Sequence, residues 1–200
     1  MRIMLVTDAW HPQINGVTNT WSYIINHLKN RHDIFVLNPY IEDAEQLPVK
    51  LQGNIPIVKN ASCIARKYYM RHMPDRVHIA TEGSLGFAMR QFCRENEINY
   101  NTSYHTSLAD YGWVLYGIPR FMTWIYVRWF HKYSRKVLVT TKSISRQLAL
   151  KNSIVWGRGV DTGQFRPLET KKHSPRKTII TVGRVSKDKN LDDFCDIRGY

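Results

Sequence analysis

The sequence predicts an α/β fold: a doubly wound parallel-sheet, Rossmann-like domain, followed by the start of a second domain. Short runs rich in Val, Ile and Leu alternate with helical patterns from Met1 to about Phe165. These runs are continuous rather than alternating, which is typical of parallel strands covered on both faces. A polar, basic, Pro-containing stretch, Lys171–Lys177, is typical of a linker and precedes a new apolar run from Thr178.

The predicted elements follow one another as strand and helix along the chain. Strands are predicted at Arg2–Thr7, Asp33–Leu37, Ile55–Lys59, Val77–Ala80, Ile98–Tyr104, Lys136–Thr140 and Ile154–Trp156. Helices are predicted at Val17–Lys29, Leu85–Glu95 and Ser143–Leu150, with Ser143 as the N-cap of the last. This order favours right-handed crossovers between parallel strands.

The chain divides into three predicted parts. Residues 1–168 form the first domain, residues 169–177 the linker, and residues 178–200 the beginning of a second domain. One strand and about one helix cannot bury two faces, so we expect the second domain to be incomplete and the natural protein to be longer.

Charge and composition restrict the partners. The net charge is +13 and the pI is about 9.8, so we expect an anionic partner, such as nucleic acid, an acidic membrane surface or a phosphorylated small molecule. The cysteines, Cys63, Cys93 and Cys195, lack CxxC spacing, which indicates reduced packing residues. No leader pattern or apolar run of about 20 residues is present, so a cytoplasmic, soluble or peripheral membrane protein is expected.

Ligands of open parallel sheets bind at the carboxyl ends of the strands, and candidate residues follow three predicted strands. Gly16 lies where the first loop turns into a helix, and either helps to bind an anion or is an ordinary loop glycine. Glu82 either binds a hydroxyl or only favours the positive end of the following helix. His105, flanked by the hydroxyls of Tyr104 and Thr106, can donate or accept a hydrogen bond to a substrate.

Two basic aromatic segments stand apart from these candidates. Arg120–Lys136 is predicted to be one helix. Its basic face carries Arg128, His131, Lys132 and Arg135, and its aromatic face carries Tyr126, Trp129, Phe130 and Tyr133. Arg66–Arg76 has similar chemistry. Such a helix is either buried with a solvated basic face or rests on anionic lipid. No nucleic-acid-binding module is recognised.

Two cations follow the apolar run of the second domain. Arg184 and Lys189 straddle the predicted start of a helix, where they suit a pyrophosphate or form an ordinary surface pair.

Taken in order, five strings resemble the family 4 retaining glycosyltransferases of the GT-B fold, especially their lipid-directed branch. The strings are VTDAWHPQINGV, VHIATEGSLG, TSYHT, WGRGVDTGQFRP and VGRVSKDKNL. The resemblance implies that Gly16, Arg184 and Lys189 bind the donor phosphates and that His105 contacts the transferred sugar and assists catalysis. It further implies acceptor or sugar binding by Asn15, Glu82, Tyr104 and Thr106.

The resemblance therefore implies a retaining hexosyltransferase that uses a nucleotide diphosphate sugar, with GDP-mannose as the first expectation. The acceptor is expected to be a lipid or glycan, at an anionic membrane surface, with no metal or other cofactor and no nucleic acid as partner. The family's acidic Glu-x7-Glu element is absent from these residues, so catalysis is expected to need more of the second domain. The alternative is a non-catalytic basic domain that binds membrane or nucleic acid.

Overall fold

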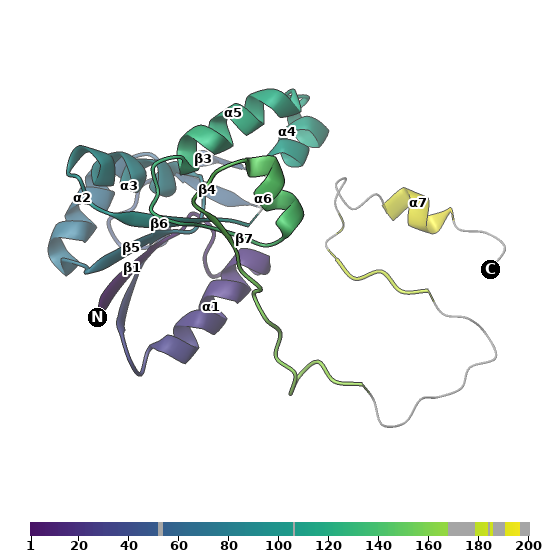
Figure 1. The fold of residues 1–200 in the computed structure, drawn as a ribbon, viewed down its shortest axis with the longest axis horizontal. Helices are drawn as coiled ribbons and strands as arrows, with labels where there is room; N and C mark the ends of the chain where they lie inside the picture. The colour runs from purple at the N-terminus through teal and green to yellow at the C-terminus, as the bar shows by residue number, and fades with distance from the viewer. Residues whose placement is uncertain (52–53, 106, 168–178, 184, 186–190, 197–200) are drawn as a thin grey trace. The chain divides into compact units, whose positions relative to one another are not determined.

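A six-stranded parallel sheet forms the centre of the fold in the computed structural model (Figure 1). The structure describes residues 1–51, 54–105, 107–167, 179–183, 185 and 191–196. The strand order is β2-β1-β5-β6-β7-β8, and every neighbouring pair is parallel. The predicted fold class is confirmed.

The strands of this sheet are short, and at least one helix lies between each strand and the next in sequence. The strands are β1 (Arg2–Val6), β2 (Asp33–Leu37), β5 (Arg76–Ile79), β6 (Tyr100–Tyr104), β7 (Val137–Val139) and β8 (Ser153–Val155). The helices are α1 (Gly16–Leu28), α2 (Ala61–His72), α3 (Ser84–Glu95), α4 (Leu108–Tyr116), α5 (Arg120–His131), α6 (Lys142–Leu148) and α7 (Leu191–Cys195).

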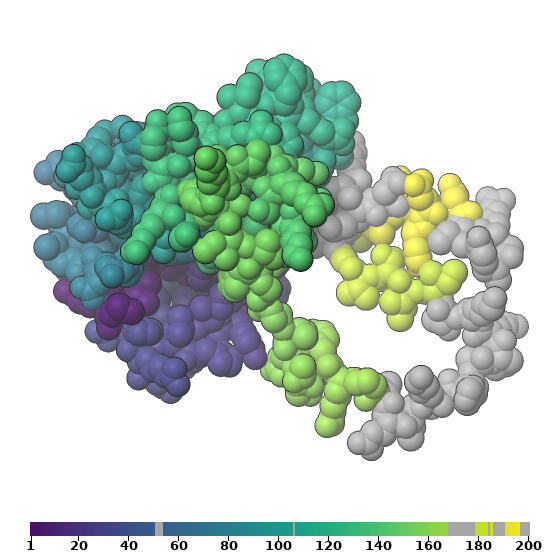
Figure 2. All heavy atoms as spheres, viewed as in Figure 1, coloured from purple at the N-terminus to yellow at the C-terminus, as the bar shows by residue number. Residues whose placement is uncertain are grey.

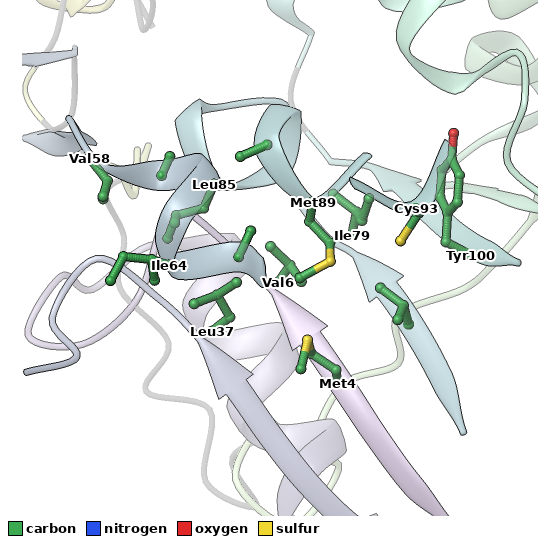
Figure 3. Packing of buried hydrophobic residues seen from close by; sticks show 14 of the residues in the cluster. Met4, Val6, Leu37, Val58, Ile64, Ile79, Leu85, Met89, Cys93 and Tyr100 are labelled. Atoms are coloured by element: carbon green, nitrogen blue, oxygen red, sulfur yellow. The ribbon is translucent and has the colours of Figure 1, made fainter. Parts of the chain in front are cut away.

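The two faces of the sheet are covered by different helices, and α1 lies on the side opposite α2 and α3 (Figure 1). The larger core lies on the α2–α3 side, where Met4 and Val6 of β1 point toward Met89 and Leu85 of α3 (Figure 3). On the other side, Trp21 of α1 packs against β1 and β5. This double coverage explains the continuous apolar runs, because residues on both faces of a strand are buried.

One predicted strand belongs to a different sheet. The prediction that Ile55–Lys59 joins the parallel sheet is wrong, because β4 (Ile55–Val58) pairs antiparallel with β3 (Gln46–Leu51), a strand that was not predicted. A run of four residues carries no information on its partner, and β3 contains Pro48, which disfavours a central strand.

Two further predictions fail at the ends of elements. The N-cap of α6 is Thr141 rather than Ser143, because Thr141 Oγ1 accepts a hydrogen bond from the amide of Ile144 at 3.2 Å. Helix α5 ends at His131 instead of Lys136. The chain must leave the helix there because the amide of Arg135 already donates to the carbonyl of Tyr100, beside β7.

About half of the predicted second domain lies outside the described residues, and the domain boundaries at 168 and 178 do so too. Residues 180–183 were expected to lie in its first strand, but they pair with no other strand in the described part of the chain. The described structure separates into two compact units. One contains residues 1–107 and 124–158, and the other contains residues 108–123 and 159–200.

The cysteines are all free thiols, in agreement with the expected reduced state. Only Cys93 is a packing residue. It lies in the core on α3, and burial raises the pKa of its thiol to about 12. Cys63 and Cys195 are exposed, so the prediction that they pack in a core is wrong.

A buried carboxylate joins β1 to α3. Asp8 follows β1, is 1% exposed, and accepts hydrogen bonds from the amides of Leu85 and Gly86 at 2.8 and 3.3 Å. The hydroxyls of Thr81 and Ser84 donate to the same carboxylate at 2.8 and 3.0 Å. Burial raises the pKa of Asp8, and these four hydrogen bonds oppose that rise.

Gly83 is required by this arrangement. A Cβ at Gly83 would collide with the carboxylate of Asp8, so a larger residue would displace either the carboxylate or the start of α3. The loop from β5 to α3 is therefore fixed against the end of β1.

We expect Asp8→Asn to lower the free energy of unfolding by about 1–3 kcal/mol, because an amide NH₂ would face donors that now share a buried acceptor. Asp33→Asn is the matched control. Asp33 is exposed at the start of β2, and we expect a change within about 0.5 kcal/mol. Urea unfolding followed by circular dichroism measures both, and equal midpoints for the two variants would contradict the assignment.

Candidate active site at the carboxyl edge of the sheet

The candidate site lies at the edge of the sheet where the parallel strands end. Asp8 follows β1, Glu82 follows β5, His105 follows β6, and Trp156 and Arg158 follow β8. Parallel pairing brings these ends to the same edge. A separate hollow of about 510 Å³ lies at the opposite, amino edge, between Asp75, Asn99 and Lys136.

His105 is held by an indole from α1. The Nε1–H of Trp21 donates a hydrogen bond to Nε2 of His105 at 3.0 Å. The other ring nitrogen, Nδ1, is buried and has no hydrogen-bond partner among the described residues. The imidazole thus has one nitrogen engaged with the protein and one polar atom that the fold leaves unsatisfied.

Aromatic rings surround this hydrogen bond. The Trp21 ring lies against that of His78 from β5, with centroids 4.6 Å apart. Trp156 contacts both Trp21 and His105, with centroid distances of 5.6 and 5.8 Å. Since Trp21 is only 7% exposed, its indole is fixed by packing as well as by its hydrogen bond.

The two histidines of this cluster favour the neutral state. Burial, together with smaller contributions from the nearby His105 and His131, lowers the pKa of His78 to about 3. Burial lowers the pKa of His105 to about 4, with the charge of Arg158 acting in the same direction. Both imidazoles are therefore uncharged at neutral pH.

The loop before α1 carries two of the predicted residues. The Oδ1 of Asn15 caps α1 by accepting from the amides of Val17 and Thr18, each at 3.0 Å. These amides are thus occupied within the protein. A Cβ on Gly16 would lie 3.9 Å from Nη1 of Arg158, so the exposed guanidinium lies at the start of α1.

Glu82 takes part in a buried network on the other face of the sheet. Its Oε1 lies 3.0 Å from Nε2 of His131, and the two side chains are 7% and 0% exposed. The Nδ1 of His131 lies 2.8 Å from Oγ1 of Thr102, which itself donates to Oγ of Ser134 at 3.1 Å. Because that hydroxyl proton is used, Nδ1 of His131 must be the donor to Thr102.

Tyr104 also lies on the face opposite His105. Successive residues of a strand point to opposite faces, and Tyr104 is buried with its ring 5.8 Å from His131 and 5.9 Å from Trp124. The structure therefore brings Asn15, Gly16 and His105 together on the α1 side, and Glu82 and Tyr104 on the α5 side. Thr106, Arg184 and Lys189 lie outside the described residues.

Sequence reasoning did not assign a role in the site to Trp21, His78 or Arg158. Arg158 could have been found, because it follows a predicted strand at the same edge as His105. Trp21 had the pattern of an apolar helix position, and its hydrogen bond spans 84 positions in sequence.

The surface of α5 differs from the predicted basic face. His131 is fully buried, and the guanidinium of Arg128 donates to the carbonyls of Leu148 and Gln147 at 3.2 and 2.9 Å. Two predicted members of that face therefore serve packing and helix capping, since the last carbonyls of α6 need donors. Phe130, predicted on the aromatic face, is also buried.

Some of the residues exposed on α3, α5 and the following turn form a mixed surface, which we call the α5 outer face. We define it by six of them: Phe87, Arg94, Ile125, Trp129, Lys132 and Tyr133. Ile125 is 61% and Trp129 40% exposed. The guanidinium of Arg94 lies 3.6 Å from the centroid of the Tyr133 ring. Atoms of α5 are visible at the surface in Figure 2.

The second basic aromatic segment is arranged differently. In α2 the rings of Tyr68 and Tyr69 pack against the core, while Arg66 and Arg71 are exposed. None of the helices in the described ranges has the length and apolar character of a membrane span.

Comparisons with known proteins agree with the fold. The profile of Glycosyltransferase Family 4 matches residues 14–164, which contain α1, His105 and Arg158. A GDP-mannose-dependent alpha-mannosyltransferase of Corynebacterium glutamicum is 26% identical over 230 residues, covering 100% of this chain and 55% of that protein. A protein of the same name from Mycobacterium tuberculosis is 24% identical and covers 96% of this chain and 58% of its own length.

A relative with a different named activity is the Alpha-monoglucosyldiacylglycerol synthase of Streptococcus pneumoniae. It is 23% identical, and the match covers 96% of this chain and 50% of its own length. The chain spans about half the length of the curated relatives it matches. The match of the family profile to three quarters of the chain, on a Rossmann-like sheet with His105 at its carboxyl edge, shows that this chain belongs to Glycosyltransferase Family 4.

Proposed function

We propose that this protein transfers a hexose from a nucleotide diphosphate sugar to a lipid or glycan acceptor, with retention of configuration. The observation that carries the proposal is the meeting of three groups at one sheet edge: the start of α1 at Gly16, the guanidinium of Arg158 and the imidazole of His105. A cation beside a helix N-terminus suits a diphosphate, and a neutral imidazole suits a sugar hydroxyl.

The donor is proposed to be GDP-mannose, because curated relatives that match the chain over nearly its whole length carry GDP-mannose in their names. Arg184 and Lys189 are proposed to hold the pyrophosphate together with Gly16. Fixed cations, with the positive end of the α1 dipole, can stabilise the charge that develops on the leaving diphosphate, so the proposed mechanism uses no metal.

The acceptor is proposed to approach the same edge. Asn15 and Thr106 are the proposed acceptor or sugar contacts next to His105. Glu82 and Tyr104 were expected to bind the sugar directly. Their burial on the opposite face supports a role through the position of the loops after β5 and β6.

The first expectation concerns the reaction. The longest polypeptide that the gene encodes should transfer mannose from GDP-mannose to a lipid or glycan acceptor and give an α-linked product, since retention keeps the anomeric configuration of the donor. Turnover should persist in EDTA. Activity that disappears with EDTA and returns with Mg²⁺ or Mn²⁺ would contradict the proposed metal-free stabilisation of the diphosphate.

The second expectation concerns the imidazole. His105→Ala should reduce kcat on the order of 10²-fold or more, because a hydrogen bond made in the transition state is lost. The thermal midpoint should fall only modestly, because the hydrogen bond lost within the described protein is the one from Nε1 of Trp21 to Nε2. Wild-type turnover, or a variant that fails to fold, would show that His105 has a structural role instead.

We further propose that the protein acts at an anionic membrane surface through the α5 outer face. Ile125 and Trp129 would enter the headgroup region, while Lys132 and Arg94 would interact with lipid phosphates. The exposed apolar side chains beside cations support this mode, and the net charge of +13 supports an anionic rather than a neutral surface.

The third expectation is salt-sensitive sedimentation with anionic vesicles, because basic residues contribute about 1 kcal/mol each near such a surface. Lys132→Glu reverses one charge and should weaken binding on the order of tenfold or more. Ile125→Asp should weaken it at all salt concentrations, since it places a charge where an apolar contact is proposed.

Matched controls lie elsewhere on the surface. Lys29→Glu after α1 makes the same charge change, and Val49→Asp in β3 makes the same kind of apolar-to-acidic change at a similarly exposed position. Both should bind as wild type does. Equal binding to neutral and anionic vesicles, or to neither, would exclude this surface, and tighter binding to DNA in the same buffer would favour the nucleic-acid alternative.

A further inference from the structure

We propose that Trp21 is a positioning residue that holds His105 in the tautomer with its proton on Nδ1, so that this N–H is the donor available to a substrate hydroxyl. The inference rests on the proposed function, because it assigns the atom of His105 that would contact the sugar. It also assigns a task to an α1 side chain that does not itself touch the reacting groups.

The direction of the hydrogen bond follows from the chemistry of the two rings. An indole Nε1 always carries hydrogen and can only donate. The 3.0 Å contact between Trp21 Nε1 and His105 Nε2 therefore requires Nε2 to be the acceptor, without a proton. A neutral imidazole has one proton, so that proton must be on Nδ1.

The same contact excludes the doubly protonated ring. An imidazolium has hydrogen on both nitrogens, and its Nε2–H would point at the N–H of Trp21. Two positively charged or ionisable groups face the same ring: Arg158, and His78 from β5. Burial and the charge of Arg158 lower the pKa of His105 to about 4, which agrees with a ring that stays neutral.

The packing explains why Trp21 can impose this orientation. Its ring packs against those of His78 and Trp156, and its backbone lies in the second turn of a helix that Asn15 caps. A side chain that is already fixed by packing loses little further entropy when it makes the hydrogen bond. The orientation of His105 is therefore set by α1.

The two ring nitrogens of His105 therefore have different roles. Nε2 is occupied by the protein, and the buried Nδ1–H has no partner in the described residues. Leaving a buried donor unsatisfied costs free energy, and a sugar oxygen would satisfy it. His105 then acts as a neutral hydrogen-bond donor, and Nε2 does not accept a proton during the reaction.

The test begins with the ring itself. Long-range ¹H–¹⁵N spectra of the ¹⁵N-labelled protein should show His105 protonated on Nδ1 at neutral pH, with no titration until about pH 4. In Trp21→Phe the ring volume is largely kept but the donor is lost. The His105 tautomer should then change and its pKa should rise toward 6.5, because a hydrogen bond to the neutral form has been removed.

Trp156→Phe is the matched control, since Trp156 packs against the same histidine while Nε2 takes its hydrogen bond from Trp21. This variant should keep the wild-type tautomer. A wild-type ring protonated on Nε2, an unchanged tautomer in Trp21→Phe, or the same change in both variants would overturn the assignment. These spectra need no substrate, so they remain decisive even if the proposed transfer reaction is not observed.

A second measurement does not depend on the folding of Trp21→Phe. The amide nitrogen of Asn can replace Nδ1–H, whereas that of Gln reaches the position of Nε2. In the longest polypeptide that the gene encodes, we expect His105→Asn to keep about 10-fold to 100-fold more turnover than His105→Gln, as one retained hydrogen bond would give. Equal turnover, or more turnover in His105→Gln, would show that Nδ1 is not the contact.

Discussion

The parallel pairing of the six strands determines where every other feature of this protein can lie. Because all neighbouring strands run in the same direction, the residues after β1, β5, β6 and β8 come to a single edge. Asp8, Glu82, His105 and Arg158 are separated by up to 150 positions in sequence and meet there for that reason alone. The helices then decide which of these residues are covered. Asp8 is covered by the start of α3, and His105 by α1, so the same edge carries both a structural carboxylate and a candidate catalytic imidazole.

The alternation of side chains along a strand divides this edge into two environments. Tyr104 and His105 are neighbours in sequence, yet one packs toward α5 with His131 and the other toward α1 with Trp21. The α5 side contains a chain of hydrogen bonds that runs from His131 through Thr102 to Ser134. Each donated hydrogen in this chain has a defined acceptor. On the α1 side, Nδ1 of His105 is buried and has no such partner among the described residues. A fully satisfied network favours rigidity, whereas an unsatisfied donor favours a ligand.

The sequence was sufficient for the fold class and for the edge at which the site lies, because both depend on strand order and on the carboxyl-end rule. The sequence was insufficient wherever the position of a residue or strand depended on a contact with a residue far away in the chain. The run at 55–59 had the composition of a strand but paired with β3, and His131 had the spacing of a surface residue but is buried against Glu82. Trp21 had the ordinary pattern of a core position. The role of its indole N–H can be recognised only when the strand that leads to His105 is placed beside α1.

In the proposed mechanism, neutral and charged groups have separate tasks at this edge. A diphosphate needs permanent positive charge, which an exposed guanidinium supplies at any physiological pH. A sugar hydroxyl needs a donor or an acceptor of fixed direction, and a histidine that changed its protonation state would reverse that direction. The positive charge of Arg158 disfavours protonation of His105, while the N–H of Trp21 stabilises its unprotonated Nε2. The group suited to phosphate thus helps to keep the neighbouring imidazole neutral, so that the recognition of charge and the recognition of hydroxyls can operate side by side.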